Sequence, residues 1–231
     1  GAEPGFDFMD GCLARQAVAQ GQLVVFLSPF KSAEALELTH VMLPVAPFTE
    51  TSGSYINTEG RLQSFSAVTP PKGQTRPAWK VLRVLGNLLD LAGFDQQDSE
   101  AVRMEAIGEG NTIAGRLANS VPVVEPLTPQ EGLERVANVP IYFTDPLVRR
   151  SQSLQRTRDA AAPTARMNGA TLESLGLADG ASIRVKQADG VADLFALADD
   201  TVAAGCVCVA AGHPSTAMLG ALSGTLSVER V

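Results

Sequence analysis

Two short apolar segments with a helix-forming stretch between them constrain the fold of this sequence more than any other feature. Residues 23–27 read Leu-Val-Val-Phe-Leu, and residues 41–43 read Val-Met-Leu. Runs that are apolar on both faces are typical of strands in a covered parallel sheet. Between them, Ser32 can cap a helix over residues 33–38. The order strand, helix, strand predicts an α/β layer.

The charge balance and the hydropathy of the chain argue against several classes of function. The sequence has 231 residues, 45% of them hydrophobic, which is enough for one large or two small domains with a proper core. Its 18 Lys and Arg residues against 25 Asp and Glu residues disfavour nucleic acid as a partner, because phosphate binding needs clustered cations. The same balance argues against an anionic membrane surface. No apolar run approaches the roughly 18 residues of a membrane span, so no direct membrane insertion is expected.

The cysteine count and the start of the chain bear on its cellular context. Three cysteines without a C-x-x-C pair predict no disulfide framework. The first residues lack the features of a secretory signal, so a reducing cytoplasm is expected. The chain opens with Gly1 and shows no recognisable domain start, and we therefore expect a segment of a longer protein.

A long helix is the firmest prediction for the first half of the chain. Residues 44–77 are rich in Pro, Gly, Thr and Ser, which indicates a long ordered loop. From Pro77 to Gly93, apolar residues recur at spacings of three and four, with the proline suited to the first turn and the glycine to the C-terminal cap. This pattern is typical of a helix whose apolar side faces the core. The residues on that side are Trp79, Leu82, Leu85, Leu88, Leu89 and Ala92.

Two further helices are expected before the chain turns to strands. A weaker helical stretch covers residues 100–107. Another helix is predicted from Thr128 to about Asn138, because Thr-Pro-Gln-Glu combines a capping box with a proline at the first helical position. Pro140 then ends it.

A domain boundary is expected in residues 145–166, which hold five arginines and few large apolar groups. This linker separates an α/β portion, residues 1–144, from a β-rich domain, residues 167–231. In the β-rich domain Asn168 caps a small helix, and Asp189 with the glycine after it supplies a turn between two strands. Short strands with tight turns predict a small barrel or sandwich.

The residues that could carry chemistry are few and scattered. His40 and His213 each lie beside apolar residues, and a lone histidine of this kind is more often packed than a ligand. Cys206 and Cys208 share one face of a strand, so we expect them in the core rather than at a metal. Cys12 has no partner nearby, and an iron–sulfur cluster takes four ligands. We expect no catalytic, cofactor-binding or metal-binding residues in this chain.

One loop carries more polar groups than a simple turn needs. The stretch from Asn57 to Gln63 follows a predicted buried strand, where α/β proteins tend to place ligand sites. Two interpretations stay open. The loop can be structural, with Glu59 and Arg61 bonded within it and glycines at positive φ, or it can contact a ligand. The structural interpretation predicts that Arg61→Ala lowers the stability of the protein.

This loop and its surroundings resemble the molybdopterin oxidoreductase superfamily. Members carry a strand ending in V-x-L-P, an acidic-Thr-Gly segment and the sequence N-T-E-G-R-x-Q, which correspond here to residues 41–44, 49–53 and 57–63. The run from Leu85 to Leu89 is similar to the large iron–sulfur subunit, of the G type, of respiratory NADH:quinone oxidoreductase, complex I. Gly212-His213-Pro214 resembles the C-terminal tail of that subunit.

The resemblance implies both a fold and a role. The implied fold is a molybdopterin-oxidoreductase-like α/β domain followed by a small β-rich domain similar to an abbreviated double-psi barrel. The implied role is a non-catalytic scaffold without the pterin cofactor, while the parent subunit binds its iron–sulfur clusters elsewhere. The implied partners are other hydrophilic-arm subunits of complex I, on the cytoplasmic side of the inner membrane.

A second role stays open beside the scaffold. The chain can be the C-terminal cofactor-holding part of a true molybdopterin oxidoreductase, such as a formate dehydrogenase or a nitrate reductase. A pterin-like ligand on the loop from Asn57 to Gln63 stays open with it.

Overall fold

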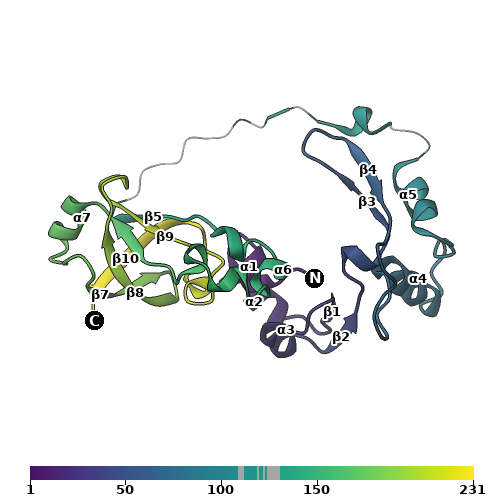
Figure 1. The fold of residues 1–231 in the computed structure, drawn as a ribbon, viewed down its shortest axis with the longest axis horizontal. Helices are drawn as coiled ribbons and strands as arrows, with labels where there is room; N and C mark the ends of the chain where they lie inside the picture. Colours follow the sequence, from purple (N-terminus) through teal and green to yellow (C-terminus); the bar gives the residue numbers. More distant parts are fainter. Residues whose placement is uncertain (109–111, 119, 122, 124–130) are drawn as a thin grey trace. The chain divides into compact units, whose positions relative to one another are not determined.

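The structure, a computed structural model, describes residues 1–108, 112–118, 120, 121, 123 and 131–231 (Figure 1). The chain divides into two compact units, each made of segments that are separate in the sequence. The first unit holds Gly1, Val25–Lys31 and Val41–Pro126; the second holds Ala2–Val24, Ser32–His40 and Leu127–Val231.

The second unit is built around a closed barrel of six strands. The strands follow one another around it in the order β10-β5-β9-β6-β8-β7. Exchanging β5 with β8, β6 with β9 and β7 with β10 gives the same order read backwards. The barrel therefore consists of two topologically equivalent halves, β5–β7 and β8–β10. The strands are β5 (Leu133–Val136), β6 (Ala165–Met167), β7 (Ser182–Gln187), β8 (Gly190–Ala198), β9 (Cys206–Val209) and β10 (Ser223–Arg230).

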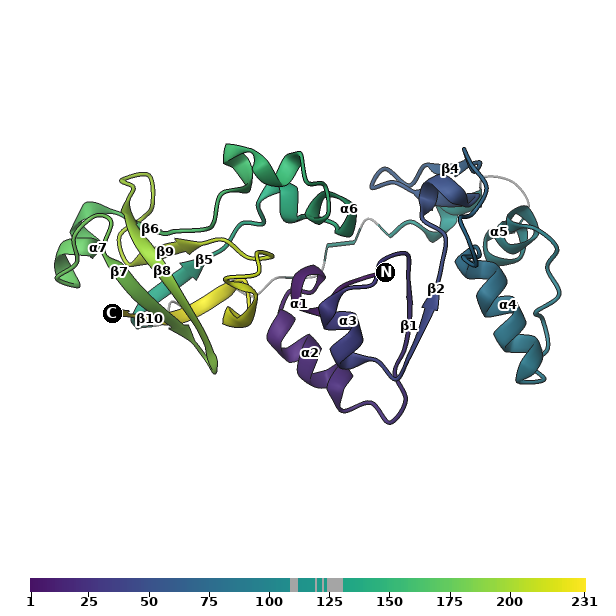
Figure 2. The same cartoon turned by 60° about the horizontal axis from the view of Figure 1, so that its bottom comes forward.

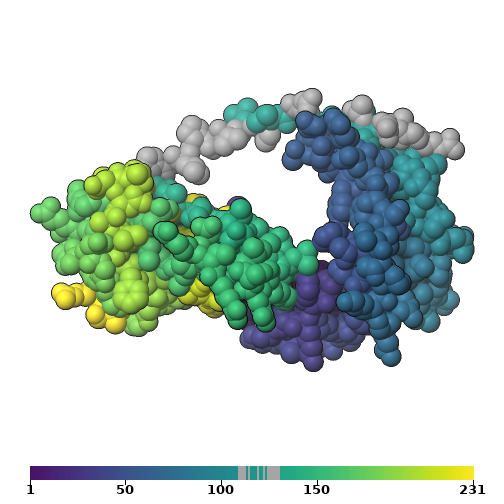
Figure 3. All heavy atoms as spheres, viewed as in Figure 1, coloured from purple at the N-terminus to yellow at the C-terminus, as the bar shows by residue number. Residues whose placement is uncertain are grey.

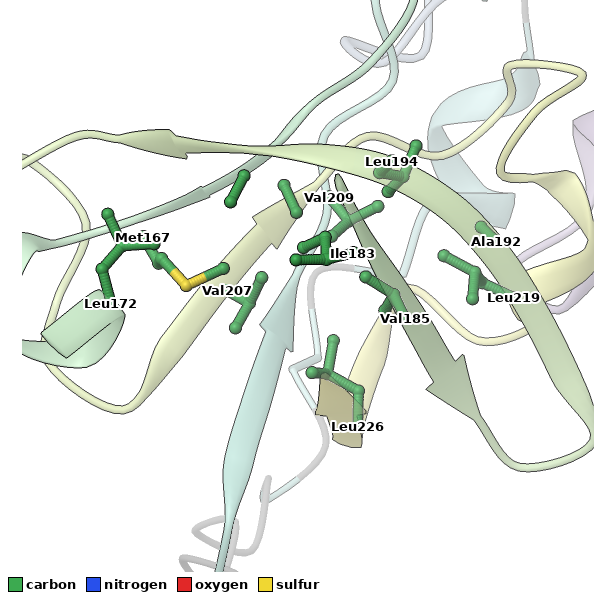
Figure 4. Close-up of a cluster of buried hydrophobic side chains, with 12 residues drawn as sticks. Met167, Leu172, Ile183, Val185, Ala192, Leu194, Val207, Val209, Leu219 and Leu226 are labelled. Carbon is green, nitrogen blue, oxygen red and sulfur yellow. The ribbon is translucent and has the colours of Figure 1, made fainter. Parts of the chain in front are cut away.

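Branched and small apolar side chains fill the barrel. Because side chains alternate between the two faces of a strand, every second residue of β7 and of most of β8 is buried. Ile183, Val185, Val207 and Val209 expose none of their surface. Figure 4 shows these side chains meeting between the strands, and the atoms of the barrel leave no opening on the face drawn in Figure 3. The expected small barrel is therefore confirmed, and its interior is a packed core.

Local signals in the sequence are confirmed in this unit. The Asn168 side chain accepts a backbone N–H at 2.8 Å and caps helix α7 (Gly169–Ser174). β7 and β8 form an antiparallel hairpin with Ala188 and Asp189 in its turn, while Gly190, which the sequence places in the turn, is the first residue of β8. Such signals depend only on neighbouring residues, which is why the sequence reveals them.

A buried arginine joins several strands at one end of the barrel. Arg135 in β5 is only 1% exposed. Its guanidinium donates to the Ala221 carbonyl and to the Gln187 side-chain oxygen, both at 2.9 Å, and to the Val209 carbonyl at 3.4 Å. Burial lowers the pKa of Arg135 from its ordinary value, and the charge of Asp10 acts in the opposite direction. One side chain thus connects β5, β7, β9 and the loop before β10.

Three helices from the start of the chain belong to the barrel unit. They are α1 (Pro4–Asp7), α2 (Gly11–Ala19) and α3 (Ala33–Leu38). The Ser32 hydroxyl accepts the Ala35 N–H at 3.0 Å and caps α3, as the sequence predicts. Helix α2 contacts both α1 and α3.

The first unit contains two small sheets. β1 (Val25–Ser28) and β2 (Val41–Pro44) pair in parallel, as predicted (Figure 2). Most of their residues are half-buried or exposed, so the expectation of a covered sheet is wrong for the part of the chain that is described. β3 (Gly53–Ile56) and β4 (Leu62–Phe65) form a hairpin in the region expected to be a loop. The other elements are η1 (Phe48–Glu50), α4 (Ala78–Leu88), α5 (Ser99–Ile107) and η2 (Thr112–Arg116).

Helix α4 ends earlier than the glycine signal predicts. Asp90 adopts a left-handed backbone with a φ of 53°. The Leu91 N–H bonds to the Gly86 carbonyl at 3.0 Å, and the Asp90 N–H bonds to the Asn87 carbonyl at 3.2 Å. These two bonds define a Schellman cap, here with an aspartate in the position that glycine usually takes. The helix is therefore closed before the chain reaches Gly93.

The leucine row of α4 faces solvent rather than the core. Leu82, Leu85, Leu88 and Leu89 are between 39% and 76% exposed. The prediction that this row is part of the core is therefore wrong. The helix itself is confirmed. The spacing of apolar residues along the sequence indicates a helix, but which side of it is buried depends on what packs against it.

The helix predicted after Thr128 is wrong where the structure describes it. Residues 128–130 lie outside the described residues, and Leu133–Val136 is strand β5. This strand pairs with β9 and β10, which lie far along the chain. Long-range pairing decides its conformation here, and a capping signal contains no information about it.

The structure also divides the chain differently from the boundary expected at residues 145–166. Strand β5 lies before that segment and β6 reaches into it, and both belong to the barrel. The segment is not a plain linker, because it forms a helix and two 3-10 turns. These elements are α6 (Pro146–Arg149), η4 (Leu154–Arg156) and η5 (Arg158–Ala160). Two further short elements of the barrel unit lie outside the segment: η3 (Ile141–Phe143) precedes it, and η6 (Ala217–Leu219) comes between β9 and β10.

We predict that Arg135→Met strongly destabilises the barrel, because buried carbonyl oxygens then lose their donor. Each buried polar group left without a partner costs about 1–3 kcal/mol, so the free energy of unfolding should fall by about 3–5 kcal/mol. Urea unfolding followed by circular dichroism measures this change. The control is Arg184→Met, which breaks only an exposed ion pair with Asp193 on the outside of the barrel. Equal effects of the two substitutions would contradict the role of Arg135.

Candidate functional site

The stretch from Asn57 to Gln63 forms the tip of the β3–β4 hairpin. The Asn57 side-chain oxygen accepts the N–H of Arg61 at 2.8 Å and that of Glu59 at 3.1 Å. The Asn57 N–H also donates to the Arg61 carbonyl at 3.1 Å. Gly60 has a φ of 77°, a conformation that glycine adopts without strain. The candidate loop is therefore a tight turn organised by one asparagine.

The side chains of Glu59 and Arg61 do not hold this turn. Their closest atoms are 3.6 Å apart, and the two side chains are 71% and 69% exposed. An exposed ion pair of this kind contributes little to stability. The expected stabilising role of the Arg61 side chain is therefore wrong, and the Asn57 side chain has that role instead. Among the glycines, Gly60 takes the positive φ and Gly53 does not.

A cavity of about 460 Å³ lies beside the segment that leads into the hairpin. Glu50 is 9% exposed and accepts the Lys72 N–H at 2.9 Å. The hydroxyls of Ser52 and Ser99 are 2.7 Å apart. Trp79 also lines the cavity, and its buried indole N–H has no partner among the described residues. Apart from this indole, the polar groups named here bind one another or the backbone.

A buried ion cluster connects α1 to α6. Glu3 accepts the Arg149 Nε–H at 2.9 Å and is also bonded to Arg150, while Arg149 reaches Asp7 at 2.9 Å. The side chains of Glu3 and Arg149 are 6% and 7% exposed. Burial, the largest influence, raises the pKa of Glu3, but the hydrogen bonds and charges of the two arginines outweigh it. The pKa of Glu3 is therefore lowered from its usual value of 4.5.

Cys208 is the buried thiol of the barrel. Its sulfur accepts an N–H of Arg166 at 3.1 Å, and Arg166 also donates to Asp199 at 2.9 Å. The hydrogen bond to Cys208 is the largest influence that raises the pKa of Arg166. Cys206 is only half-buried. The structure thus places Cys208 in the barrel wall next to a cation.

Both histidines take part in structural contacts. The ring of His213 packs edge-on against Phe143 at 4.6 Å, and its Nδ1 accepts the Ser215 N–H at 3.0 Å. Burial lowers the pKa of His213 from its ordinary 6.5. His40 Nδ1 accepts the Val24 N–H at 3.0 Å. Neither ring lies with other metal-ligating side chains of the described residues.

In the described ranges of the chain, no group of three or more His, Cys, Asp or Glu side chains gathers into a possible metal site. No helix within those ranges is long and apolar enough to cross a membrane.

Known proteins are similar to this chain in the sequence of its first part and in the fold of the whole. Residues 2–88 match the molybdopterin oxidoreductase family. The structure is similar to acetylene hydratase from Pelobacter acetylenicus with a TM-score of 0.67 and 16% sequence identity, over 100% of this chain and 43% of that one. At this identity the likeness shows the fold alone. Residues 2–88 are thus similar to the molybdopterin oxidoreductases, and the predicted fold class is confirmed.

Curated relatives define the resemblance further. The chain is 41% identical over 88 residues to the NADH-ubiquinone oxidoreductase 78 kDa subunit of Candida albicans, which covers 38% of this chain and 11% of the relative. It is 28% identical over 194 residues to the G subunit of the NADH-quinone oxidoreductase of Streptomyces coelicolor, covering 81% and 22%. It is 30% identical over 97 residues to a nitrate reductase of Synechocystis, covering 40% and 13%. The predicted resemblance to the large subunit of NADH:quinone oxidoreductase is thus confirmed, and the chain spans less than a quarter of these relatives.

Polar groups of the candidate loop and of the cavity beside it are used within the fold. The side-chain oxygen of Asn57 is used by two backbone N–H groups, and that of Glu50 by a third.

The charged residues with the greatest structural role escaped the sequence analysis. Arg135 lies in a stretch predicted to be helical, and Arg149 and Arg150 lie in the expected linker. The adjacent arginines after Asp145-Pro146 were the available signal, because arginine forms strong, often bidentate hydrogen bonds with carboxylates. Their partner Glu3 is far away in the sequence, and nothing local indicates it.

We predict that Asn57→Ala weakens the β3–β4 hairpin and that Arg61→Ala does not. Removing the Asn57 oxygen leaves two N–H groups of the turn to water, at a cost of about 1–2 kcal/mol. Hydrogen exchange of the β3 and β4 amides should become about 5- to 30-fold faster in Asn57→Ala. Faster exchange in Arg61→Ala than in Asn57→Ala would contradict this assignment.

We predict that the Glu3 cluster makes the barrel unit sensitive to acid. Since the pKa of Glu3 is lower in the folded state, its contribution is complete above the unfolded value near 4.5 and is lost as the pH falls through the folded pKa. Glu3→Gln should cost about 3 kcal/mol at pH 7, because it removes the buried carboxylate that binds both Arg149 and Arg150. It should also flatten the stability profile below pH 4.5. Urea unfolding at a series of pH values measures both effects; an unchanged acid limb in Glu3→Gln contradicts them.

Proposed function

We propose that this chain is a non-catalytic structural segment of the large iron–sulfur subunit of a respiratory NADH:quinone oxidoreductase, complex I. One observation carries the proposal: the charged and polar groups that could have served chemistry are engaged in contacts that hold the fold. Arg135 and Glu3 are buried among partners from distant parts of the chain. The similarity to a G-type relative over 81% of the chain supports the same role.

The proposal includes a position in the parent complex. The segment packs against other subunits of the hydrophilic arm, peripheral to the inner membrane and on its cytoplasmic side. Electron transfer takes place through iron–sulfur clusters held elsewhere in the parent subunit. The barrel, with its two equivalent halves, is of the double-psi type, a form compatible with the strand order described above.

The alternative is a cofactor-holding segment of a true molybdopterin oxidoreductase. The similarity of 97 residues to a nitrate reductase favours it. In that case the exposed Glu59 and Arg61 at the hairpin tip would be the residues presented to a ligand.

The test uses the full-length parent subunit with Arg135→Met and, as a matched control, Arg184→Met. A scaffold predicts several-fold less assembled complex for Arg135→Met, because destabilisation lowers the amount of folded subunit. The rate of NADH oxidation with an artificial acceptor should stay near normal per assembled flavin. Normal assembly with lost activity per flavin would contradict the scaffold. Stoichiometric molybdenum in the purified parent protein would establish the alternative.

A further inference from the structure

A second cavity of the first unit lies between α4 and α5, two helices that are side by side in Figures 1 and 2. Its volume is about 430 Å³, within the range of pockets that hold small molecules. Leu82 of α4, Val102 of α5 and Phe94 from the segment between the helices give it apolar walls. Such walls suit a ligand with an apolar body.

Two hydrogen-bond donors of α4 are buried at this cavity without an acceptor. The Nε1–H of Trp79 and the Nε–H of Arg83 bond to no group that the structure describes. The two residues are four positions apart in the helix, so their side chains leave it on the same face, one turn apart. Both residues line the cavity. Because buried donors are nearly always bonded, two unused donors at one cavity indicate that an acceptor belongs there.

The packing around α4 holds these donors in place. Another nitrogen of Arg83 donates to the Gln96 carbonyl at 2.9 Å, which fixes the guanidinium. Gly86, on the same face of the helix, is buried, and a Cβ there would lie 2.3 Å from the ring of Phe94. The rotation of α4 about its axis is therefore fixed. Leu82 is 48% exposed, so its side chain is free to change rotamer as a ligand enters.

The cavity has a negative charge on its α5 side. Glu105 of α5 lines it, and its carboxylate accepts a hydrogen bond from the Gln96 side chain. Since Arg83 donates to the backbone of the same Gln96, a cation and a carboxylate both border the cavity. A simple carboxylate ligand would be attracted by Arg83 but repelled by Glu105. A molecule that carries both charges matches this arrangement.

We propose that the cavity binds a small α-amino acid with an apolar side chain. The carboxylate of this ligand accepts the free N–H groups of Trp79 and Arg83, and its ammonium group faces Glu105. Its side chain packs against Phe94 and Val102. Hydrogen bonds between arginine and a carboxylate are among the strong ones in proteins, and the apolar contacts distinguish this ligand from a polar amino acid.

The indole of Trp79 provides a direct measurement of binding. Trp79 is the single tryptophan of the chain, so its indole N–H gives one resolved signal in a proton–nitrogen correlation NMR spectrum. L-Leucine added to the 231-residue chain up to about 10 mM, a range suited to a ligand of this size, should move this signal downfield until it saturates. L-Serine, which has no apolar side chain, should leave it in place. A signal that L-leucine does not move would overturn the proposal.

Two molecules that each lack one charged group of leucine test how the ligand is held. Isocaproate, which is leucine without its amino group, should bind at least about ten-fold more weakly, because nothing then offsets the charge of Glu105. Isoamylamine, which is leucine without its carboxylate, should not move the indole signal. Binding of isocaproate as tight as that of L-leucine would overturn the amino acid and assign the cavity to a simple carboxylate.

Substitutions test the two charges separately. Arg83→Met should lower the affinity for L-leucine at least about ten-fold, because the ligand carboxylate loses its cation. Glu105→Gln should weaken L-leucine several-fold and strengthen isocaproate, a reversal that a loss of stability cannot produce. The control is Glu100→Gln in the same helix, which changes a largely exposed carboxylate outside the cavity and should bind as the unmodified chain does.

Circular dichroism shows whether each variant is folded. If Arg83→Met fails to fold, Glu105→Gln still decides, because it changes an exposed side chain. Equal binding of L-leucine by Glu105→Gln and the unmodified chain would overturn the proposal. The site does not depend on the role in complex I proposed above, since each measurement uses this chain alone.

Discussion

The barrel depends on a cation that, within the described residues, has no carboxylate among its hydrogen-bond partners. Arg135 is almost fully buried, and the groups that accept its hydrogen bonds are neutral oxygens from β7, β9 and the loop before β10. A buried charge is tolerated only when its donors are satisfied, so the strands that supply these oxygens must come together for the guanidinium to be buried at all. This coupling makes the closure of the barrel cooperative and fixes which strand ends meet.

A second buried charge cluster extends the same principle to the first helix. Glu3 and Asp7 bind arginines of α6, well over a hundred residues away, so the start of the chain belongs to the barrel unit. Removing one partner of a buried ion pair lowers the free energy of unfolding by several kcal/mol, whereas replacing the whole pair by apolar residues often leaves it unchanged. Such clusters therefore favour one specific arrangement more than they add stability. In both clusters, charged side chains that lie in the interior serve the fold.

The sequence predicts what neighbouring residues decide and fails where distant residues decide. The Ser32 and Asn168 caps, the turn at Asp189 and the start of α4 rest on local chemistry, and each is confirmed. Strand β5 was mistaken for a helix because its partners lie far along the chain. In the candidate loop, the sequence predicts a turn with a glycine at positive φ. It does not show that Asn57 rather than Arg61 stabilises the turn, because that depends on which side chain is bonded and which is exposed. The leucine row has the correct periodicity, yet periodicity cannot say what covers an apolar face.

The chain combines buried charged clusters with an exposed apolar helix face, and both features bear on what the molecule can do. A group that acts as an acid, base or ligand must be able to change its partners during the reaction. Glu3, whose pKa is lowered by two arginines, and Arg135, whose donors bind strand oxygens, have their partners fixed by the fold. Exposed apolar surface, in contrast, lowers the free energy of the system when another surface covers it. The fixed polar groups and the exposed leucines of α4 are the two observations that support the scaffold proposed above.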